Sequence, residues 1–397
     1  LSSYLHGGAD DNVPPDQART MVEALEPFHR AFTYHEEPDA GHWWGGDEEP
    51  GADCVDWAPM FDLFARSVRP TIDAVRDIHF TTANPGVSSS SGWVAIEAQR
   101  EMLRPASVDI RHDPHRRAFA GTTDNVARLR LDTRHVLPGD GITVELDGQE
   151  LEPIVPSDAG SIWLRRDGGA WTTTRQPSPD LKGPRRYGPF KLAFRRRMAF
   201  VYGTAGSAEE NAWAHAKARH DAEMFWYRGN GAVDVLPDSD LTGRMALHRN
   251  VILYGNADTN AAWNHLLADS PIYVGGGVVS VDGRELTGGD LAVLFLRPVA
   301  NTDDGLVGVV SGTGIAGMRL TDRLPVFVAG VAYPDVTVIG PEALVVGPQG
   351  VRLAGLFGED VHMWSAGRRL SVATPTDQHS VTTPPSGGRV ERRGPEC

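Results

Sequence analysis

The chain has 397 residues, 41% of them hydrophobic, and its 52 acidic and 38 basic side chains give a net charge of −14. This length allows roughly two or three domains, and the composition is that of an ordinary globular protein. The acidic balance argues against a general nucleic-acid binder, which would carry a basic face. No apolar run reaches the roughly eighteen residues that indicate a membrane span, and the two cysteines are too few for a disulfide framework or a zinc site.

Residues 1–70 carry most of the acidic excess, which is typical either of a solvated surface or of a cleft that attracts a cationic group. They predict a strand over 3–7, a helix over 15–28, a strand over 31–37 and a helix over 55–68. This order is typical of the closing part of a parallel α/β sheet. We expect the second helix to bury an apolar face that consists of Met60, Phe61, Phe64 and Val68.

From about residue 71 the sequence changes to short segments of alternating polarity, separated by Gly, Pro and Asp turns. The pattern is typical of an antiparallel β-rich module. Residues 173–189 are rich in Pro, Arg, Lys and Gly and predict a linker or a long loop. The predicted strands cover residues 92–99, 106–112, 126–133, 142–148 and 161–167.

A second α/β region follows, with strands predicted over 197–204 and 250–256 and helices over 207–226 and 260–267. Alternating strands and helices with glycine at the strand ends favour a doubly wound, three-layer sheet. The polar end of the chain, rich in Pro, Ser, Thr and Arg, predicts disorder. The chain therefore divides into part of an α/β sheet, a β-rich module with its linker, a three-layer α/β module and a disordered tail, at 1–70, 71–189, 190–358 and 359–397.

Asp10 and His42 form the first candidate for catalysis, because each follows one of two consecutive predicted strands. In α/β-hydrolases the triad follows the chain order nucleophile, acid, histidine. The carboxylate holds the imidazole in one tautomer and stabilises the imidazolium that forms when it accepts the proton of the nucleophile. The alternative is that Asp10 is a turn or helix-cap residue and that His42 is a surface residue.

Two segments, YLHGGADDNVPPDQA and YHEEPDAGHWW, carry a resemblance to a known family. Together they resemble the C-terminal end of the catalytic domain of prolyl oligopeptidase family serine peptidases, which are α/β-hydrolases. The resemblance covers about residues 1–70. The matching residues are His6, Gly7, Asp10, Asp11, Asn12, Val13 and Gln17 in the first motif, and Gly41 and His42 in the second.

The resemblance implies a role for several of these residues. Asp10, the first acid of the pair, would be the triad acid, and His42 would be the triad histidine. Asp11 would support Asp10, and Asn12 matches the dipeptidyl-peptidase form of the motif, in which this position reaches the bound substrate. Beside His42, Trp43 is a candidate for the wall that faces the substrate, although with Trp44 it could equally cover the loop.

The sequence departs from the family because it contains no Gly-x-Ser-x-Gly. The strings around Ser207 and Ser311 have the wrong spacing, and both lie after His42. We therefore expect the nucleophilic serine upstream of this chain, in a larger serine peptidase that hydrolyses peptide bonds, and we expect the chain alone to be inactive. The alternatives are an esterase, or a non-catalytic accessory or binding protein with a vestigial hydrolase end.

Two further patterns give weaker candidates. His6, Asp10, His35 and His42 could bind a metal ion, but no HExxH or paired i, i+4 histidines support this. The YGTAGS segment at 202–207 is similar to a phosphate-binding loop before a helix, yet it lacks both glycine-rich patterns of such loops. We therefore expect neither a cofactor nor a metal ion, and a peptide as the substrate.

Overall fold

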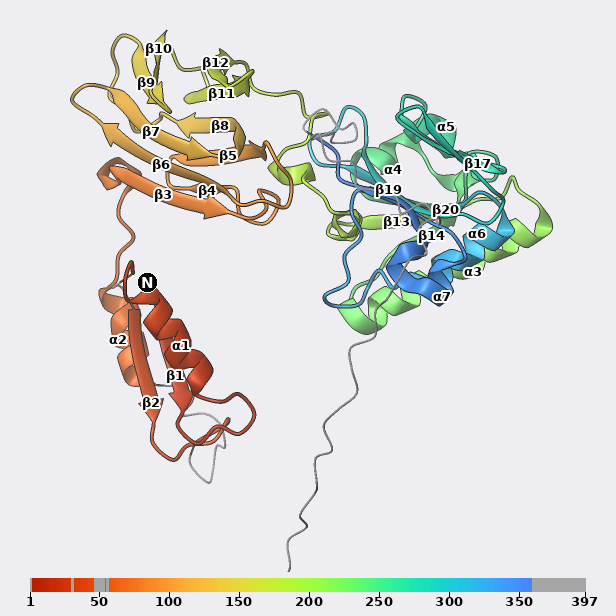
Figure 1. Ribbon diagram of the computed structural model, residues 1–397, viewed down its shortest axis with the longest axis horizontal. Coiled ribbons are helices and arrows are strands. Elements are labelled where there is room, and N and C mark those ends of the chain that lie inside the picture. Colours follow the sequence, from red (N-terminus) through yellow and green to blue (C-terminus); the bar gives the residue numbers. More distant parts are fainter. Residues whose placement is uncertain (1, 30–31, 46–53, 55–56, 359–397) are drawn as a thin grey trace, which may run out of the picture. The chain divides into compact units, whose positions relative to one another are not determined.

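The computed structural model describes residues 2–29, 32–45, 54 and 57–358 (Figure 1). The chain separates into two compact units, Leu1–Val75 and Arg76–Cys397. The predicted fold class, α/β combined with β-rich parts, is confirmed. The tail that was expected to be disordered, 359–397, lies outside the described residues. Among the described residues no helix is long and apolar enough to cross a membrane.

The first unit is a small βα arrangement in which two strands pair in parallel. The strands are β1 (Ser2–Gly7) and β2 (Phe32–Glu37), with Ser2 opposite Phe32 and Gly7 opposite Glu37. The helix α1 (Asp16–Leu25) connects them, and α2 (Ala58–Arg66) follows β2. A single 3-10 turn, η1 (Ile72–Ala74), precedes the second unit. Because the two strands are parallel, their carboxyl ends lie at the same edge of the sheet.

The expectation that α2 buries its apolar face is wrong for this structure. Phe61 and Phe64 are 49% and 51% exposed, and Val68 is 89% exposed. No residue of α1 or α2 is buried, because two strands offer too little surface for two helices to cover. The described residues of the first unit therefore leave its apolar helix faces uncovered.

The second unit begins with two five-stranded sheets that face one another (Figure 1), in the orders β10-β9-β7-β6-β3 and β12-β11-β8-β5-β4. All neighbouring strands are antiparallel except β7 and β9, which are parallel. Buried side chains alternate along the strands that face the core, as in β6. The strands are β3 (Asp77–Thr82), β4 (Ser90–Ser91), β5 (Val94–Gln99), β6 (Ala106–Asp113), β7 (Ala118–Asp124), β8 (Val126–Asp132), β9 (Ile142–Leu146), β10 (Gln149–Ile154), β11 (Ser161–Asp167) and β12 (Ala170–Thr174).

A seven-stranded mixed sheet forms the centre of the α/β module, in the order β14-β13-β15-β20-β19-β21-β22. The strands β14, β13, β15 and β20 are parallel, whereas β19, β21 and β22 pair in antiparallel fashion. The strand bounds are β13 (Met198–Tyr202), β14 (Asp234–Pro237), β15 (Asn250–Tyr254), β19 (Ala292–Pro298), β20 (Leu306–Gly312), β21 (Val336–Ile339) and β22 (Val351–Gly355).

This sheet is the middle of three layers. Consecutive residues of β13 enter opposite cores: Phe200 packs with the long helix α3 (Ala208–Gly229) and α6 (Ile315–Leu320), and Val201 packs on the other face. That other face is covered by α5 (Trp263–Leu266), by α4 (Gly243–Leu247) and by a small sheet. The small sheet consists of β16 (Ile272–Gly275), β17 (Val278–Val281) and β18 (Arg284–Thr287), and α7 (Ala343–Val346) precedes β22.

The segment predicted as a linker, 173–189, is largely without strand but is packed rather than exposed. Lys182 is buried, and its Nζ lies 2.5 Å from Asp335 Oδ2 and 3.0 Å from the carbonyl oxygen of Phe357. The Tyr187 hydroxyl accepts a hydrogen bond of 2.8 Å from the backbone N–H of Gln99 in β5. The segment thus contacts both the β-rich module and the α/β module. Its two 3-10 helices are η2 (Pro184–Arg186) and η3 (Phe190–Phe194).

Candidate active site

The carboxyl ends of β1 and β2 are bound together by their loops. The N–H of Gly8 donates to the carbonyl of Glu37, and the N–H of Ala9 donates to the carbonyl of Ala40, both at 2.8 Å. A Cβ on Gly7 would lie 2.2 Å from the carbonyl oxygen of Gly41, so only glycine allows this approach. The loop that carries Asp10 and the loop that carries His42 are therefore adjacent.

Asp10 is held in one orientation by its own turn. Its Oδ1 accepts hydrogen bonds from the backbone N–H groups of Asn12 (2.9 Å) and Val13 (2.8 Å), and its side chain is only 4% exposed. Burial alone would raise the pKa of Asp10, but the hydrogen bonds from Val13, His42 and Asn12 outweigh it, so the pKa lies below its ordinary value. Asp10 is therefore a fixed carboxylate.

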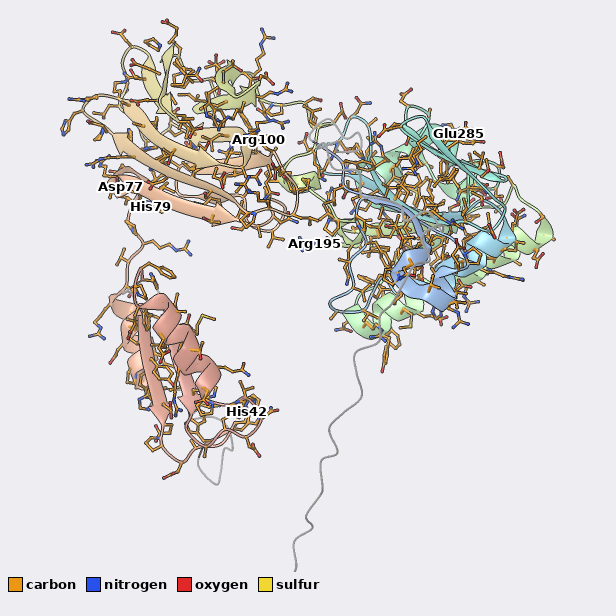
Figure 2. The ribbon with its side chains drawn as sticks, viewed as in Figure 1. His42, Asp77, His79, Arg100, Arg195 and Glu285 are labelled. Carbon is orange, nitrogen blue, oxygen red and sulfur yellow. The ribbon has the colours of Figure 1, made fainter. Side chains whose placement is uncertain are left out.

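His42 completes the pair that the sequence predicted. Its Nδ1 lies 2.9 Å from Asp10 Oδ2, so the carboxylate accepts a hydrogen bond from the imidazole. In this tautomer Nε2 carries the lone pair, and Nε2 has no hydrogen-bond partner among the described residues. Figure 2 shows His42 at the end of the first unit where β1 and β2 terminate. The pair has the orientation that general-base catalysis requires.

His6 supports the same carboxylate. Its Nε2 donates to the carbonyl of Val13 at 2.8 Å and lies 3.6 Å from Asp10 Oδ2. The Val13 backbone thereby binds both Asp10, through its N–H, and His6, through its carbonyl. The sequence placed His6 in the first motif and in a possible metal site, but it gave no signal for this positioning contact.

A pocket of about 350 Å³ opens beside the pair. Trp43 is 70% exposed, and its ring lies perpendicular to the His42 imidazole at 5.2 Å between centroids. No hydroxyl side chain lines this pocket among the described residues. The lining residues are Leu5, His6, Gly7, Asp10, Val13, His42, Trp43, Trp44 and Cys54. The pocket thus presents an oriented imidazole and two indole rings, and its described lining residues include no serine.

Asp11 and Asn12 are both exposed. Within the described ranges, neither side chain makes a hydrogen bond, and Asn12 contacts Asp10 only through its backbone N–H. The supporting role of Asp11 and the substrate contact of Asn12 therefore remain predictions.

An ion-pair network next to the site was not predicted from the sequence. Arg19 of α1 donates to Glu36 of β2 through its Nε (3.0 Å) and its Nη2 (2.5 Å), and the Tyr34 hydroxyl donates to the same carboxylate at 2.7 Å. The hydrogen bond from Arg19, followed by that from Tyr34, lowers the pKa of Glu36 to about 2. The network attaches α1 to β2 and so holds the two strands that place Asp10 and His42.

The weaker sequence candidates have structural explanations. His35 stacks on Trp57 at 4.7 Å and bonds Glu37 at 2.9 Å, and no group of metal-ligating side chains occurs in the described part of the chain. Ser207 caps α3 in a reciprocal pair with Glu210, so the YGTAGS segment is a helix-capping turn. Ser311 is fully buried in β20. Neither serine is a candidate nucleophile.

Comparisons with known proteins give one distant relative. No family model matches the chain. A protein of Arthroderma benhamiae that is named an uncharacterized secreted protein is 23% identical over an alignment of 371 residues that covers 89% of this chain. The similarity therefore extends into both units. The chain spans 38% of the length of that relative.

Proposed function

We infer that residues 1–75 supply the acid and the histidine of a serine peptidase of the prolyl oligopeptidase type. The observation that carries this proposal is the contact of 2.9 Å between His42 Nδ1 and Asp10 Oδ2, at the shared edge of two parallel strands. The carboxylate is buried and held by two backbone N–H groups, whereas the far nitrogen of the imidazole faces a pocket. Pairs that serve structure alone have no need of an open second nitrogen.

In the proposed reaction His42 transfers protons. Nε2 accepts the hydroxyl proton of a serine as the serine oxygen attacks the peptide carbonyl carbon. The imidazolium then donates that proton to the leaving amine, which completes the acyl-enzyme. In the second half Nε2 accepts a proton from a water molecule as the water oxygen attacks the acyl carbon. The imidazolium then returns that proton to the serine oxygen, and the acid product leaves. Asp10 remains ionised throughout and stabilises the imidazolium.

We propose that the serine comes from polypeptide outside residues 1–397. Two observations support this. The apolar faces of α1 and α2 lack a cover, as expected for the last elements of a larger sheet. The relative, of which the chain spans 38%, is a much longer protein. We also propose that the enzyme acts outside the cell, in line with the name of that relative.

An esterase, or an accessory protein with a vestigial hydrolase end, is the second candidate. The accessory protein is favoured by the absence of a hydroxyl side chain from the described residues that line the pocket beside His42. A vestigial site needs no nucleophile at all, whereas the peptidase needs one within reach of Nε2.

The test is active-site labelling with a fluorophosphonate, which reacts with activated serines. Residues 1–397 are expressed alone and also together with the polypeptide encoded directly upstream. We expect no labelling of the chain alone, and labelling of one upstream serine in the longer protein. The substitution His42→Ala should abolish that labelling, and Glu23→Gln, at an exposed position of α1, should leave it unchanged.

Two results would contradict the proposal. One is labelling of a serine within residues 1–397, and the other is labelling of the longer protein that persists after His42→Ala. Turnover of ester substrates with none of peptide amides would favour the esterase.

A further inference from the structure

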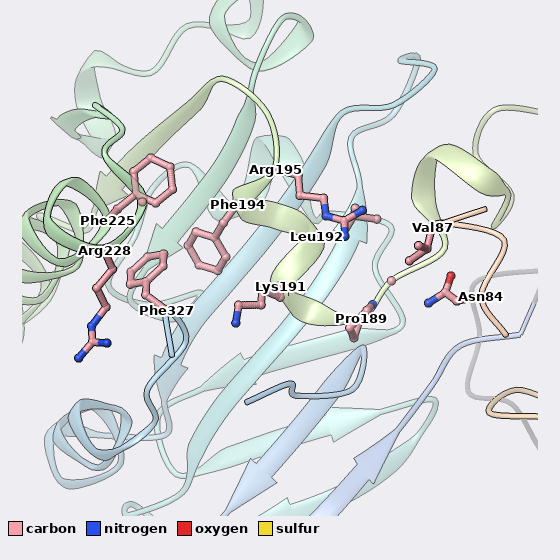
Figure 3. A pocket seen from close by; sticks show the side chains of 12 residues that line it. Asn84, Val87, Pro189, Lys191, Leu192, Phe194, Arg195, Phe225, Arg228 and Phe327 are labelled. Carbon is pink, nitrogen blue, oxygen red and sulfur yellow. The ribbon is translucent and has the colours of Figure 1, made fainter. Parts of the chain in front are cut away.

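The second unit contains a hollow of about 340 Å³ with an aromatic floor, shown in Figure 3. Phe327 contacts the two other rings of this floor: its ring is 5.0 Å from that of Phe194 and 5.7 Å from that of Phe225, between centroids. These rings come from η3, from α3 and from the segment before β21. Leu192 and Pro189 extend the apolar floor. The volume lies in the range of pockets that bind small molecules.

Three cationic side chains line the same hollow: Lys191, Arg195 and Arg228. Lys191 Nζ donates to the carbonyls of Val328 (2.8 Å) and Val331 (3.2 Å), which fixes its ammonium beside the floor. Figure 3 shows Arg228 beside the aromatic group, whereas the side chain of Arg195, which directly follows η3, is turned toward Leu192. In the part of the chain that the structure describes, no carboxylate forms an ion pair with any of the three.

This arrangement contrasts with the rest of the protein. The chain has a net charge of −14, and many of its other arginines bind an acid, as Arg219 binds Glu223 on the same helix. Three cations without a carboxylate around an apolar floor create a local positive potential where an anion would be attracted. Guanidinium groups bind carboxylates with two parallel hydrogen bonds, and aromatic rings bind apolar groups of similar size.

We propose that this hollow, which we call the cationic pocket, binds a small amphiphilic anion. Its ligand has an aromatic or branched aliphatic body, which covers Phe194, Phe225 and Phe327, and one carboxylate, which Arg228 binds. Free aryl-alkanoic acids and the C-terminus of a peptide that ends in an aromatic residue share this chemistry. The pocket lies in the second unit and involves neither Asp10 nor His42, so the proposal is independent of the proposed peptidase function.

The test measures binding to the full chain by ligand-observed NMR titration. Three compounds share one ring and differ in charge: 3-phenylpropionate, its neutral amide, and the cation 3-phenylpropylamine. N-acetylphenylalanine represents a peptide C-terminus. We expect 3-phenylpropionate to bind with a Kd of about 0.1 to 10 mM, the range for a ligand with this number of atoms. The amide should bind about tenfold more weakly, and the amine should not bind.

Two pairs of variants locate the site. Arg228→Gln should weaken binding of 3-phenylpropionate about five- to tenfold, and Arg219→Gln, which removes the same charge from another face of α3, should not. Val87→Asp places a carboxylate at the rim of the pocket and should abolish binding, whereas Val155→Asp, at an equally exposed valine, should have no effect. All four positions are exposed, so the variants are expected to fold, which circular dichroism checks.

The comparison of N-acetylphenylalanine with 3-phenylpropionate distinguishes the two sources of ligand. Tighter binding of the former indicates a peptide C-terminus, and tighter binding of the latter indicates a free acid. The proposal is overturned if no compound shows saturable binding up to about 20 mM, if the amide binds as well as the acid, or if Arg219→Gln weakens binding as much as Arg228→Gln.

Discussion

The Asp10–His42 pair shows what two residues need from their surroundings in order to act together. Two backbone N–H groups lower the pKa of Asp10 against the effect of burial and fix the orientation of its carboxylate. Only one carboxylate oxygen then remains for His42. Because Asp11 is exposed and makes no such contacts, the structure distinguishes two adjacent acids that have the same chemistry.

If the chain is part of the proposed peptidase, Asp10→Asn in the protein extended upstream should lower kcat/KM on a peptide amide by about three to four powers of ten, because an amide at this position favours the wrong imidazole tautomer. The matched control is Asp11→Asn, for which we expect less than about a fivefold change. The assignment of the acid would be wrong by one residue if Asp11→Asn were the more damaging. Circular dichroism of both variants excludes unfolding as the cause.

His112 is a second residue whose surroundings determine its behaviour. It is 1% exposed in the β-rich module, stacks on Phe119 at 4.6 Å and lies 4.8 Å from the ring of His135. Burial, then the charges of His135 and Arg76, lower its pKa to about 4, and Asp113 opposes this shift. The folded protein therefore keeps His112 neutral at a pH where the unfolded chain protonates it.

This difference predicts a loss of stability in acid. Between pH 6.5 and about 4 the unfolded state binds a proton that the folded state does not bind. The free energy of unfolding therefore decreases as the pH is lowered through this range, by up to about 3 kcal/mol. We expect His112→Phe to flatten this part of the pH dependence of the urea midpoint. His115→Phe, at an exposed histidine nearby, should leave the dependence as it is. Equal slopes for His112→Phe and wild type would contradict the prediction.

At the scale of elements, local pattern was sufficient wherever periodicity was strong. The spacing of apolar residues predicted α1 and α2, and the alternation in 106–112 predicted β6. The strands β10 and β12 were not predicted, because they are short and largely exposed. The sequence pattern of a helix also does not show which surface the helix packs against, because its burial depends on how many strands the sheet has.

This distinction leads to opposite expectations for two phenylalanines. Phe200 in β13 is fully buried, and Phe200→Ala should lower the free energy of unfolding by about 3–5 kcal/mol. Phe61 in α2 is half exposed, and in the present chain Phe61→Ala should cost less than about 1 kcal/mol. Urea denaturation compares the two. A large cost for Phe61→Ala would mean that the first unit buries this helix face in solution.

For the whole molecule, the sequence could not show which distant segments meet. His42 was paired with Asp10 because each follows one of two consecutive predicted strands, and a family resemblance supported that pairing. The contacts of His6 and of the Arg19–Glu36 pair had no sequence signal. The cationic pocket likewise draws residues from the β-rich module, from η3, from the end of α3 and from the segment before β21. Such sites depend on the packing of modules, which composition does not reveal.

The packing of the second unit depends on Lys182. Burial lowers the pKa of this ammonium and the charge of Asp335 opposes that shift, so the pair is stable only while both groups are present. Removing one partner from a buried ion pair leaves an uncompensated charge and costs about 3–5 kcal/mol. The segment around Lys182 contacts both modules through Asp335 and through Tyr187, so its loss should release the connection between them.

We therefore predict that Lys182→Met makes the segment 175–189 sensitive to trypsin. In the native protein Arg186 is buried and donates to the carbonyl of Pro179 and to Thr302, which keeps the adjacent peptide bonds away from the protease. Limited proteolysis followed by mass spectrometry should show new cleavage after Arg185 and Arg186 in the variant, at least about tenfold faster than in wild type. Lys191→Met serves as the control, because Lys191 is a half-buried cation that donates only to carbonyl groups. If Lys182→Met is cleaved no faster than Lys191→Met, the buried pair with Asp335 does not hold the segment, and the connection between the two modules must depend on Arg186 and Tyr187 instead.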